Sequence, residues 1–302
     1  MKVFPHNFDP SSNSGPNKFT RTLFTSLINQ GQIDVVDNQI VADIEFCLIQ
    51  QAAHKIKPMV LRLDGIWFNS EQDFKKQNLP IQFAYSNADA VIFQSQFNKK
   101  LTEQWFGKHK KSYVIHNAAD EKLINRIDKK FWNQKLGNPR EVWSCASSWR
   151  PHKRLKDNIS YFLKFAPQDA VLAIAGKGAS IDNLKVDSKR IFFLGELDYL
   201  SLLSLYKISS TFIHLAYLDH CPNVVVDAQA AGCHIVCSST GGTSEIVNNG
   251  TILVEKEWDY SPIELYKPPE VDFYSFVKKE TSFTNEFEKC TEAYYNVFKE
   301  VF

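Results

Sequence analysis

Short apolar segments typical of β-strands alternate with helix-like patterns along the whole 302-residue chain. This alternation favours an α/β fold, in which parallel sheets carry helices on both faces. In the first half we expect strands at 2–4, 44–49, 59–63, 90–94 and 112–115, and the clearest helices at 17–29 and 96–106. In the second half we expect strands at 142–146, 171–175, 191–194, 212–215, 234–237 and 252–254.

The length of the chain exceeds what one hydrophobic core usually occupies, so we expect two small domains. A polar stretch at 128–140, which contains Gly137 and Pro139, separates the two series of strands. We therefore predict two Rossmann-like domains at 1–138 and 139–280, facing a central cleft. The aromatic-rich segment 281–302 predicts a C-terminal helix that packs back toward the N-terminal domain.

The composition excludes several classes of protein. Thirty-five basic residues balance 34 acidic ones, so no overall field attracts nucleic acid or an anionic membrane. The six cysteines are scattered without metal-ligand spacing, and no run of about 18 apolar residues is present. We expect a cytoplasmic protein with reduced thiols and no metal. The basic segment 108–111 leaves peripheral contact with the inner face of a membrane open, although a solvated patch explains it equally.

Two acids frame the most informative segment. Asp219 follows the expected strand 212–215, and Asp227 lies seven intervening residues later in the second turn of a helix that Pro222 is suited to begin. Ligands of open α/β sheets bind at the carboxyl ends of the strands, and a carboxylate accepts two hydroxyl hydrogen bonds. These acids therefore suit the diols of a ribose or hexose. A loop acid followed by a solvated helix residue is the alternative.

Two further segments suit an anion. Gly241–Glu245 follows the strand 234–237 and begins another helix, so its amides favour a diphosphate, although a simple turn has the same sequence. Four cations lie within one stretch of seven residues after the strand 142–146, and they would neutralise a diphosphate leaving group. The alternative is a solvated basic helix start. These cations are Arg150, Lys153, Arg154 and Lys156.

The first half offers two candidate sites. The segment 14–17 turns the chain from the first strand into a helix, and Asp64 ends the strand 59–63. Both positions lie where this architecture places ligands, but an ordinary turn and a loop cap are the alternatives. No histidine has the spacing of a metal or triad ligand. His6, His116 and His214 are interpreted as structural residues, and only His220 draws interest, because it follows Asp219.

At these residues the sequence resembles the retaining family 4 glycosyltransferases of the GT-B fold over nearly its whole length. Residues 219–245 resemble the family signature, in which two acids separated by seven residues precede a small-residue helix, a strand and Gly-Gly-x-x-Glu. The segments 85–95 and 114–120 resemble the end of the acceptor domain. The segments 173–178 and 193–195 resemble strands of the donor domain.

The resemblance implies a hexosyltransferase that uses a nucleotide diphosphate sugar, without metal or other cofactor, and a carbohydrate or lipid-linked acceptor. Asp227 would hold the ribose, and Lys153 with the Gly242 and Thr243 amides would hold phosphate. The remaining donor-site residues would be Gly15, Asn17, Asp219, His220, Cys221, Pro222 and Asn223. The catalytic set would be Asp64, Arg150, Lys153 and Asp219.

Three departures from the family pattern affect this assignment. Both family glutamates are aspartates here, Ser148 replaces an arginine whose charge Arg150 would supply, and Asp64 stands where many members have histidine. Two alternatives stay open, namely an inactive protein that binds nucleotide sugar or glycan and a nucleotide-sugar epimerase of the same fold. A nicotinamide oxidoreductase is disfavoured, because no Gly-x-Gly-x-x-Gly begins a helix with an acid about 20 residues later.

Overall fold

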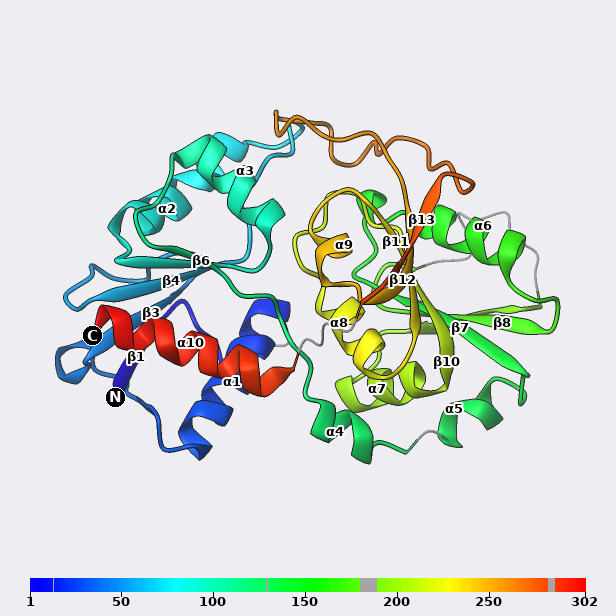
Figure 1. Cartoon of the computed structure of the whole chain (residues 1–302), viewed down its shortest axis with the longest axis horizontal. Coiled ribbons are helices and arrows are strands. Elements are labelled where there is room, and N and C mark those ends of the chain that lie inside the picture. The colour runs from blue at the N-terminus through cyan, green and yellow to red at the C-terminus, as the bar shows by residue number, and fades with distance from the viewer. Residues whose placement is uncertain (13, 129, 180–188, 282–285) are drawn as a thin grey trace. The chain divides into compact units, whose positions relative to one another are not determined.

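The computed structural model describes residues 1–12, 14–128, 130–179, 189–281 and 286–302 (Figure 1). The chain forms two compact units, each built on its own sheet. The first unit comprises Met1–Asn117, Tyr260–Ile263 and Phe287–Phe302, and the second comprises Ala118–Asp259 and Glu264–Glu286.

The first sheet has six parallel strands in the order β2-β1-β3-β4-β5-β6. Its central strands, β3 and β4, are buried at every position, as the continuous apolar runs of a covered parallel sheet require. The strands are β1 (Lys2–His6), β2 (Asp34–Val35), β3 (Ile44–Leu48), β4 (Met59–Leu63), β5 (Ala90–Phe93) and β6 (Ser112–Val114).

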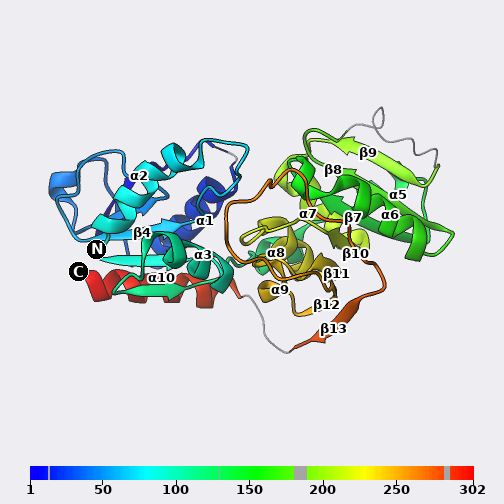
Figure 2. The same ribbon diagram turned by 90° about the horizontal axis from the view of Figure 1, so that it is seen from above.

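Helices cover both faces of the first sheet. Figure 1 shows α2 (Phe74–Asn87) and α3 (Gln96–Phe106) on one face, and α1 (Gly15–Asn29) and α10 (Phe287–Val301) on the other. A short 3-10 helix, η1, spans Gln39–Val41. The amphipathic α10 buries Tyr294 and Phe298, so this C-terminal helix belongs to the core of the first unit. Both chain termini lie close together on this unit (Figures 1 and 2).

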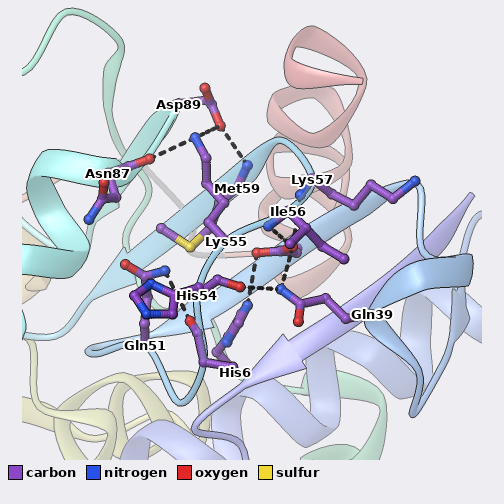
Figure 3. Close-up of polar contacts among 12 residues, drawn as sticks. His6, Gln39, Gln51, His54, Lys55, Ile56, Lys57, Met59, Asn87 and Asp89 are labelled. Carbon is purple, nitrogen blue, oxygen red and sulfur yellow. Dashed lines mark hydrogen bonds and ion pairs between the residues drawn. The ribbon is translucent and has the colours of Figure 1, made fainter.

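A buried polar cluster ties the beginning of the first sheet to the loop that precedes β4. Glu45 and His6 are fully buried and lie 2.9 Å apart. The second oxygen of Glu45 accepts from Gln39 Nε2 at 2.7 Å and from the amides of Ile56 and Lys57 at 2.8 and 2.9 Å (Figure 3). Several donors thus compensate the desolvation of one buried carboxylate, which stabilises the loop.

The second sheet has seven strands in the order β13-β12-β11-β10-β7-β8-β9. Six run parallel, and the edge strand β13, which was not expected, pairs antiparallel with β12. The strands are β7 (Glu141–Ala146), β8 (Ala170–Ala175), β9 (Ile191–Gly195), β10 (Ser209–His214), β11 (His234–Ser238), β12 (Asn249–Leu253) and β13 (Phe276–Glu280).

The second unit has two apolar clusters, because alternate residues of each strand point to opposite faces. Val142 and Ala146 of β7 belong to one cluster, together with residues of α7 and α8. Trp143 and Cys145 belong to the other cluster, with residues of α6. The helices are α4 (Glu121–Arg126), α5 (Lys130–Lys135), η2 (Pro151–Lys153), α6 (Leu155–Phe165), α7 (Tyr199–Ile208), α8 (Asn223–Ala230) and α9 (Thr243–Ile246).

The first unit ends earlier than the predicted boundary at residue 138. The segment that begins at Ala118 lies with the second unit, because Ile124, Trp132 and Leu136 are buried in its hydrophobic cluster. Trp132 also donates its indole N–H to the Ser201 carbonyl at 2.9 Å. Within residues 132–136, Trp132 and Leu136 are buried and the residues between them are exposed, so this part of the polar stretch is an amphipathic surface layer of the second unit.

The α/β architecture with two Rossmann-like units is confirmed. Each expected strand is present with bounds that differ by up to three residues, and the two strands missed are β2 and β13. No helix in the described ranges is long and apolar enough to cross a membrane.

Candidate functional site

The loops that follow β7 and β8 lie against each other at the carboxyl edge of the second sheet. The Trp149 amide donates to the Lys177 carbonyl at 2.9 Å, and the Trp149 indole donates to the Ala175 carbonyl at 2.9 Å. Gly176 has φ +110°, and a Cβ built there would lie 1.9 Å from the Ser147 carbonyl oxygen. Only glycine permits this approach, which fixes the start of the basic segment.

Lys153 and Asp219 form the centre of the candidate site. Lys153 ends η2, and its Nζ lies 2.5 Å from Asp219 Oδ2, with side-chain exposures of 17% and 15%. Burial alone would raise the pKa of Asp219, but Lys153 and His214 hold it well below its usual range. The structure thus brings together a cation and an acid that lie 66 residues apart in the sequence.

Three donors hold the Asp219 carboxylate. His214 Nε2 lies 2.9 Å from Oδ2, the oxygen that Lys153 also contacts, and the His220 amide donates to Oδ1 at 3.0 Å. Burial lowers the pKa values of His214 and His220, the latter to about 4. Both imidazoles are therefore neutral at pH 7.

The Gly-Gly turn after β11 closes on the Asp219 loop. The Gly242 amide donates to the Asp219 carbonyl at 2.7 Å. Gly241 has φ +82°, and a Cβ at this position would lie 2.5 Å from the same carbonyl oxygen. The Gly242 amide, which we predicted for phosphate, is thus engaged with the protein. Beside it, Thr243 Oγ1 is buried without a hydrogen-bond partner in the part of the chain that the structure describes.

Asp227 lies on the buried side of α8, with 6% of its surface exposed. Tyr199, the first residue of α7, donates its hydroxyl to Asp227 Oδ1 at 3.3 Å, and burial together with this carboxylate raises the pKa of Tyr199. Pro222 caps α8 at its amino end, Asn223 is the first helical residue, and the preceding Cys221 is buried. The predicted sugar-binding segment therefore enters a helix as expected.

The four cations after β7 have different environments, so the expectation that all four face an anion was wrong. Arg154 is 3% exposed and makes a bidentate pair with Glu255, at 3.0 and 2.7 Å. It also donates to the carbonyls of Leu215 and Pro269, at 3.3 and 2.8 Å. Arg154 is thus a structural residue. Arg150 and Lys156 are exposed, and Lys153 is partly buried.

The candidates of the first unit are placed at the carboxyl edge of its sheet. Gly15 begins α1. Asn17 has its side chain engaged locally, since its Oδ1 accepts from the Asp9 amide at 2.8 Å and its Nδ2 donates to Ser14 Oγ at 2.9 Å. Asp64 follows β4, 3.3 Å from the buried Arg62, and burial raises the pKa of Asp64 although Arg62 opposes this shift.

Sequence reasoning missed His214 and Tyr199, which hold the two predicted sugar-binding acids. His214 was interpreted as a structural residue, and its position at the carboxyl end of β10 is the signal that indicated otherwise. Tyr199 gave no local signal, because it contacts Asp227 across a separation of 28 residues.

Residues 106–261 match the family model described as Glycosyl transferases group 1. This segment is half of the chain and contains the Lys153–Asp219 pair, the Gly-Gly turn and Asp227. The chain belongs to this family. The segment also includes Arg150 and Asn223.

One curated relative is the GDP-mannose-dependent monoacylated alpha-(1-6)-phosphatidylinositol monomannoside mannosyltransferase of Corynebacterium glutamicum, 26% identical over 191 residues. The match covers 56% of this chain, and the chain spans about half the length of that relative, 49%.

Solved structures are similar in fold. HepE of Anabaena, crystallised with UDP and glucose, has a TM-score of 0.65 at 18% identity and covers 87% of this chain and 88% of its own. Sucrose-phosphate synthase of Thermosynechococcus elongatus has a TM-score of 0.71 at 11% identity, over 99% of this chain and 98% of its own. At these identities the likeness shows the fold, which is the α/β GT-B fold.

Proposed function

We propose that the chain transfers a hexosyl group from a nucleotide diphosphate sugar to a hydroxyl acceptor with retained anomeric configuration and without a metal ion. The observation that carries the proposal is Lys153, held 2.5 Å from Asp219 at the carboxyl edge of the second sheet in a member of this family. Sheets of this kind bind nucleotides at that edge.

Lys153 and Arg150 supply positive charge toward the diphosphate leaving group. Positive charge placed beforehand where negative charge develops lowers the barrier of group transfer. No covalent nucleophile is required, because the enzyme orients the acceptor hydroxyl while the departing phosphate takes its proton. We assign Asp64 to the orientation of the sugar or acceptor.

The two aspartates differ in what they can bind. Three protein donors already hold Asp219, so it orients Lys153 and has only its remaining Oδ1 lone pair for a sugar hydroxyl. Asp227 accepts a hydrogen bond from the Tyr199 hydroxyl, and we assign it to the ribose because it lies in the helix that follows the Asp219 loop. In the Gly-Gly turn, we keep Thr243 assigned to phosphate. The Gly242 amide would first have to release the Asp219 carbonyl before it could bind phosphate.

The relatives support a proposal for the substrate class. The mannosyltransferase name specifies GDP-mannose and a lipid-linked acceptor, and the HepE structure contains UDP and glucose. We propose a UDP- or GDP-sugar as donor and a carbohydrate or lipid-linked hydroxyl as acceptor, with no nucleic acid partner. We also propose a cytoplasmic location, with peripheral contact at the inner face of a membrane if the acceptor is lipid-linked.

The decisive experiment measures release of nucleoside diphosphate from UDP- and GDP-sugars by wild type and by Lys153→Ala and Asp227→Ala. Lys153→Ala should reduce turnover at least about 100-fold, as the loss of a charged transition-state contact does. Asp227→Ala should reduce turnover at donor concentrations below saturation, because it removes the carboxylate that we assign to ribose binding. Lys156→Ala is the matched control, because Lys156 is exposed and unassigned. Near wild-type turnover in both site variants would refute the assignment.

The same assay separates the alternatives. Nucleotide-sugar binding without turnover would indicate an inactive binding protein. Conversion of the donor without any acceptor would indicate an epimerase. Full activity in excess EDTA is expected, and its complete loss would contradict the metal-independent mechanism.

A further inference from the structure

His214 stands between the sheet and the Lys153–Asp219 pair. It is the last residue of β10, it is 4% exposed, and its ring stacks on Phe212 with centroids 6.4 Å apart and an interplanar angle of 12°. The backbone of β10 pairs with β7 on one side and β11 on the other. The sheet therefore fixes the position of the imidazole independently of the loop that follows β10.

The imidazole touches the same oxygen as the lysine. Asp219 Oδ2 lies 2.9 Å from His214 Nε2 and 2.5 Å from Lys153 Nζ. A carboxylate only accepts hydrogen bonds, so Nε2 carries the proton of the neutral ring. Burial lowers the pKa of His214, which keeps the ring neutral, so the imidazole adds no second positive charge beside Lys153.

The lysine itself has no such support from secondary structure. Lys153 lies at the end of the three-residue helix η2, and its long side chain is flexible. Its direction therefore depends on Asp219, and the direction of the Asp219 carboxylate depends on the donors that hold it. Of these, the His220 amide is on the same loop, whereas His214 belongs to the central part of the sheet.

We propose that His214 is a positioning residue, which fixes the Asp219 carboxylate so that Asp219 presents the Lys153 ammonium group to the diphosphate of the donor. This inference rests on the proposed function. The order of contacts is rigid strand, neutral imidazole, carboxylate and ammonium group. Loss of the imidazole N–H lets the carboxylate rotate, and the ammonium group loses its fixed direction.

Two variants distinguish positioning from packing. His214→Gln retains an N–H donor, whereas His214→Leu fills similar space without one. For the leucine variant we expect the Kd of UDP, measured by calorimetry, and the KM of the nucleotide sugar to rise about 10-fold or more, as loss of a charge-assisted hydrogen bond predicts. The glutamine variant should recover most of this loss. If both variants bind UDP as wild type does, the inference is wrong.

A double-mutant cycle tests that His214 acts through Asp219. In an Asp219→Asn background, His214→Leu should cost much less UDP affinity than in wild type, because the charged acceptor is already gone. Equal costs in both backgrounds would overturn the inference. Thermal unfolding of each variant shows whether it is folded. If the leucine variant does not fold, the glutamine variant still allows the test.

A readout without nucleotide separates this inference from the proposed function. Nitrogen NMR of the histidine side chains should show His214 as the Nε2–H tautomer in wild type, and Asp219→Asn should shift this signal. The opposite tautomer, or a signal that ignores Asp219→Asn, would overturn the positioning role even if UDP binds. If the NMR signals behave as expected but the chain binds no UDP, the proposed function alone is contradicted.

Discussion

Gly241 gives the sharpest test of how the two loops of the candidate site are joined. Its backbone has φ +82°, and a Cβ added there would lie 2.5 Å from the Asp219 carbonyl oxygen and 2.8 Å from the Asp219 nitrogen. Both neighbours are backbone atoms, so they cannot rotate away. Gly241→Ala must therefore push the Gly-Gly turn and the Asp219 loop apart.

The expected cost has two parts. A non-glycine residue at positive φ costs about 1–2 kcal/mol. Overlap with fixed atoms in a packed region costs about another 1–3 kcal/mol. We expect Gly241→Ala to lower the free energy of unfolding by about 3 kcal/mol and to weaken UDP binding, because the turn also holds the Asp219 carbonyl through Gly242.

Gly232→Ala is the matched control. Gly232 has φ +99°, but nothing lies within 4 Å of a Cβ built there. Its substitution therefore has only the conformational cost, about 1–2 kcal/mol, and leaves UDP affinity unchanged. Urea unfolding and calorimetry with UDP give both quantities for each variant. Equal losses of stability in the two variants, or unchanged UDP affinity in Gly241→Ala, would refute the close approach.

Three further predictions concern pH, a buried hydrogen bond and the thiols. Burial lowers the pKa of His152 to about 3 in the folded chain, against about 6.5 when unfolded, so its contribution to stability is complete above pH 6.5 and declines toward pH 3. Urea titrations at pH 7 and pH 5 should therefore show a loss of stability that is smaller by about 2 kcal/mol in His152→Gln than in wild type. Tyr294→Phe removes the hydroxyl that accepts a hydrogen bond from Arg62 Nε at 3.1 Å, and it should destabilise the first unit by about 1–3 kcal/mol. Lys267→Ala, which breaks the exposed ion pair of Lys267 with Glu264, should cost less than about 1 kcal/mol. All six cysteines are buried, and burial raises the pKa of the Cys145 thiol. A thiol reagent should therefore label the folded chain much more slowly than the urea-unfolded chain. Rapid labelling of the folded chain would contradict this burial.

The sequence predicted most of the fold because covered parallel strands carry their signal locally. β8 reads as six buried apolar residues, and the helix α1 starts at a Gly-Pro pair. The missed β13, Phe-Val-Lys-Lys-Glu, is largely exposed at a sheet edge, where charged residues replace the apolar pattern. The boundary near residue 138 was misplaced because the burial of Trp132 depends on α7, about 70 residues later.

The candidate site was predictable as a set of residue types but not as a set of contacts. Spacing indicated Asp219, Asp227 and the glycine pair, since each follows a strand. It did not separate Lys153 from the neighbouring Arg154, whose φ of +53° turns its side chain to the buried Glu255. The contact of His214 was also missed, although its partner Asp219 lies only five residues later, because the sequence does not show that the loop after β10 turns this carboxylate back onto the imidazole.

A structure of the chain with bound UDP would show directly whether Lys153 binds the diphosphate of the donor. We expect the diphosphate within hydrogen-bond reach of Lys153 Nζ and the ribose hydroxyls at Asp227, at the carboxyl edge of the second sheet. A diphosphate bound away from Lys153, with the Lys153–Asp219 pair unchanged, would contradict this expectation.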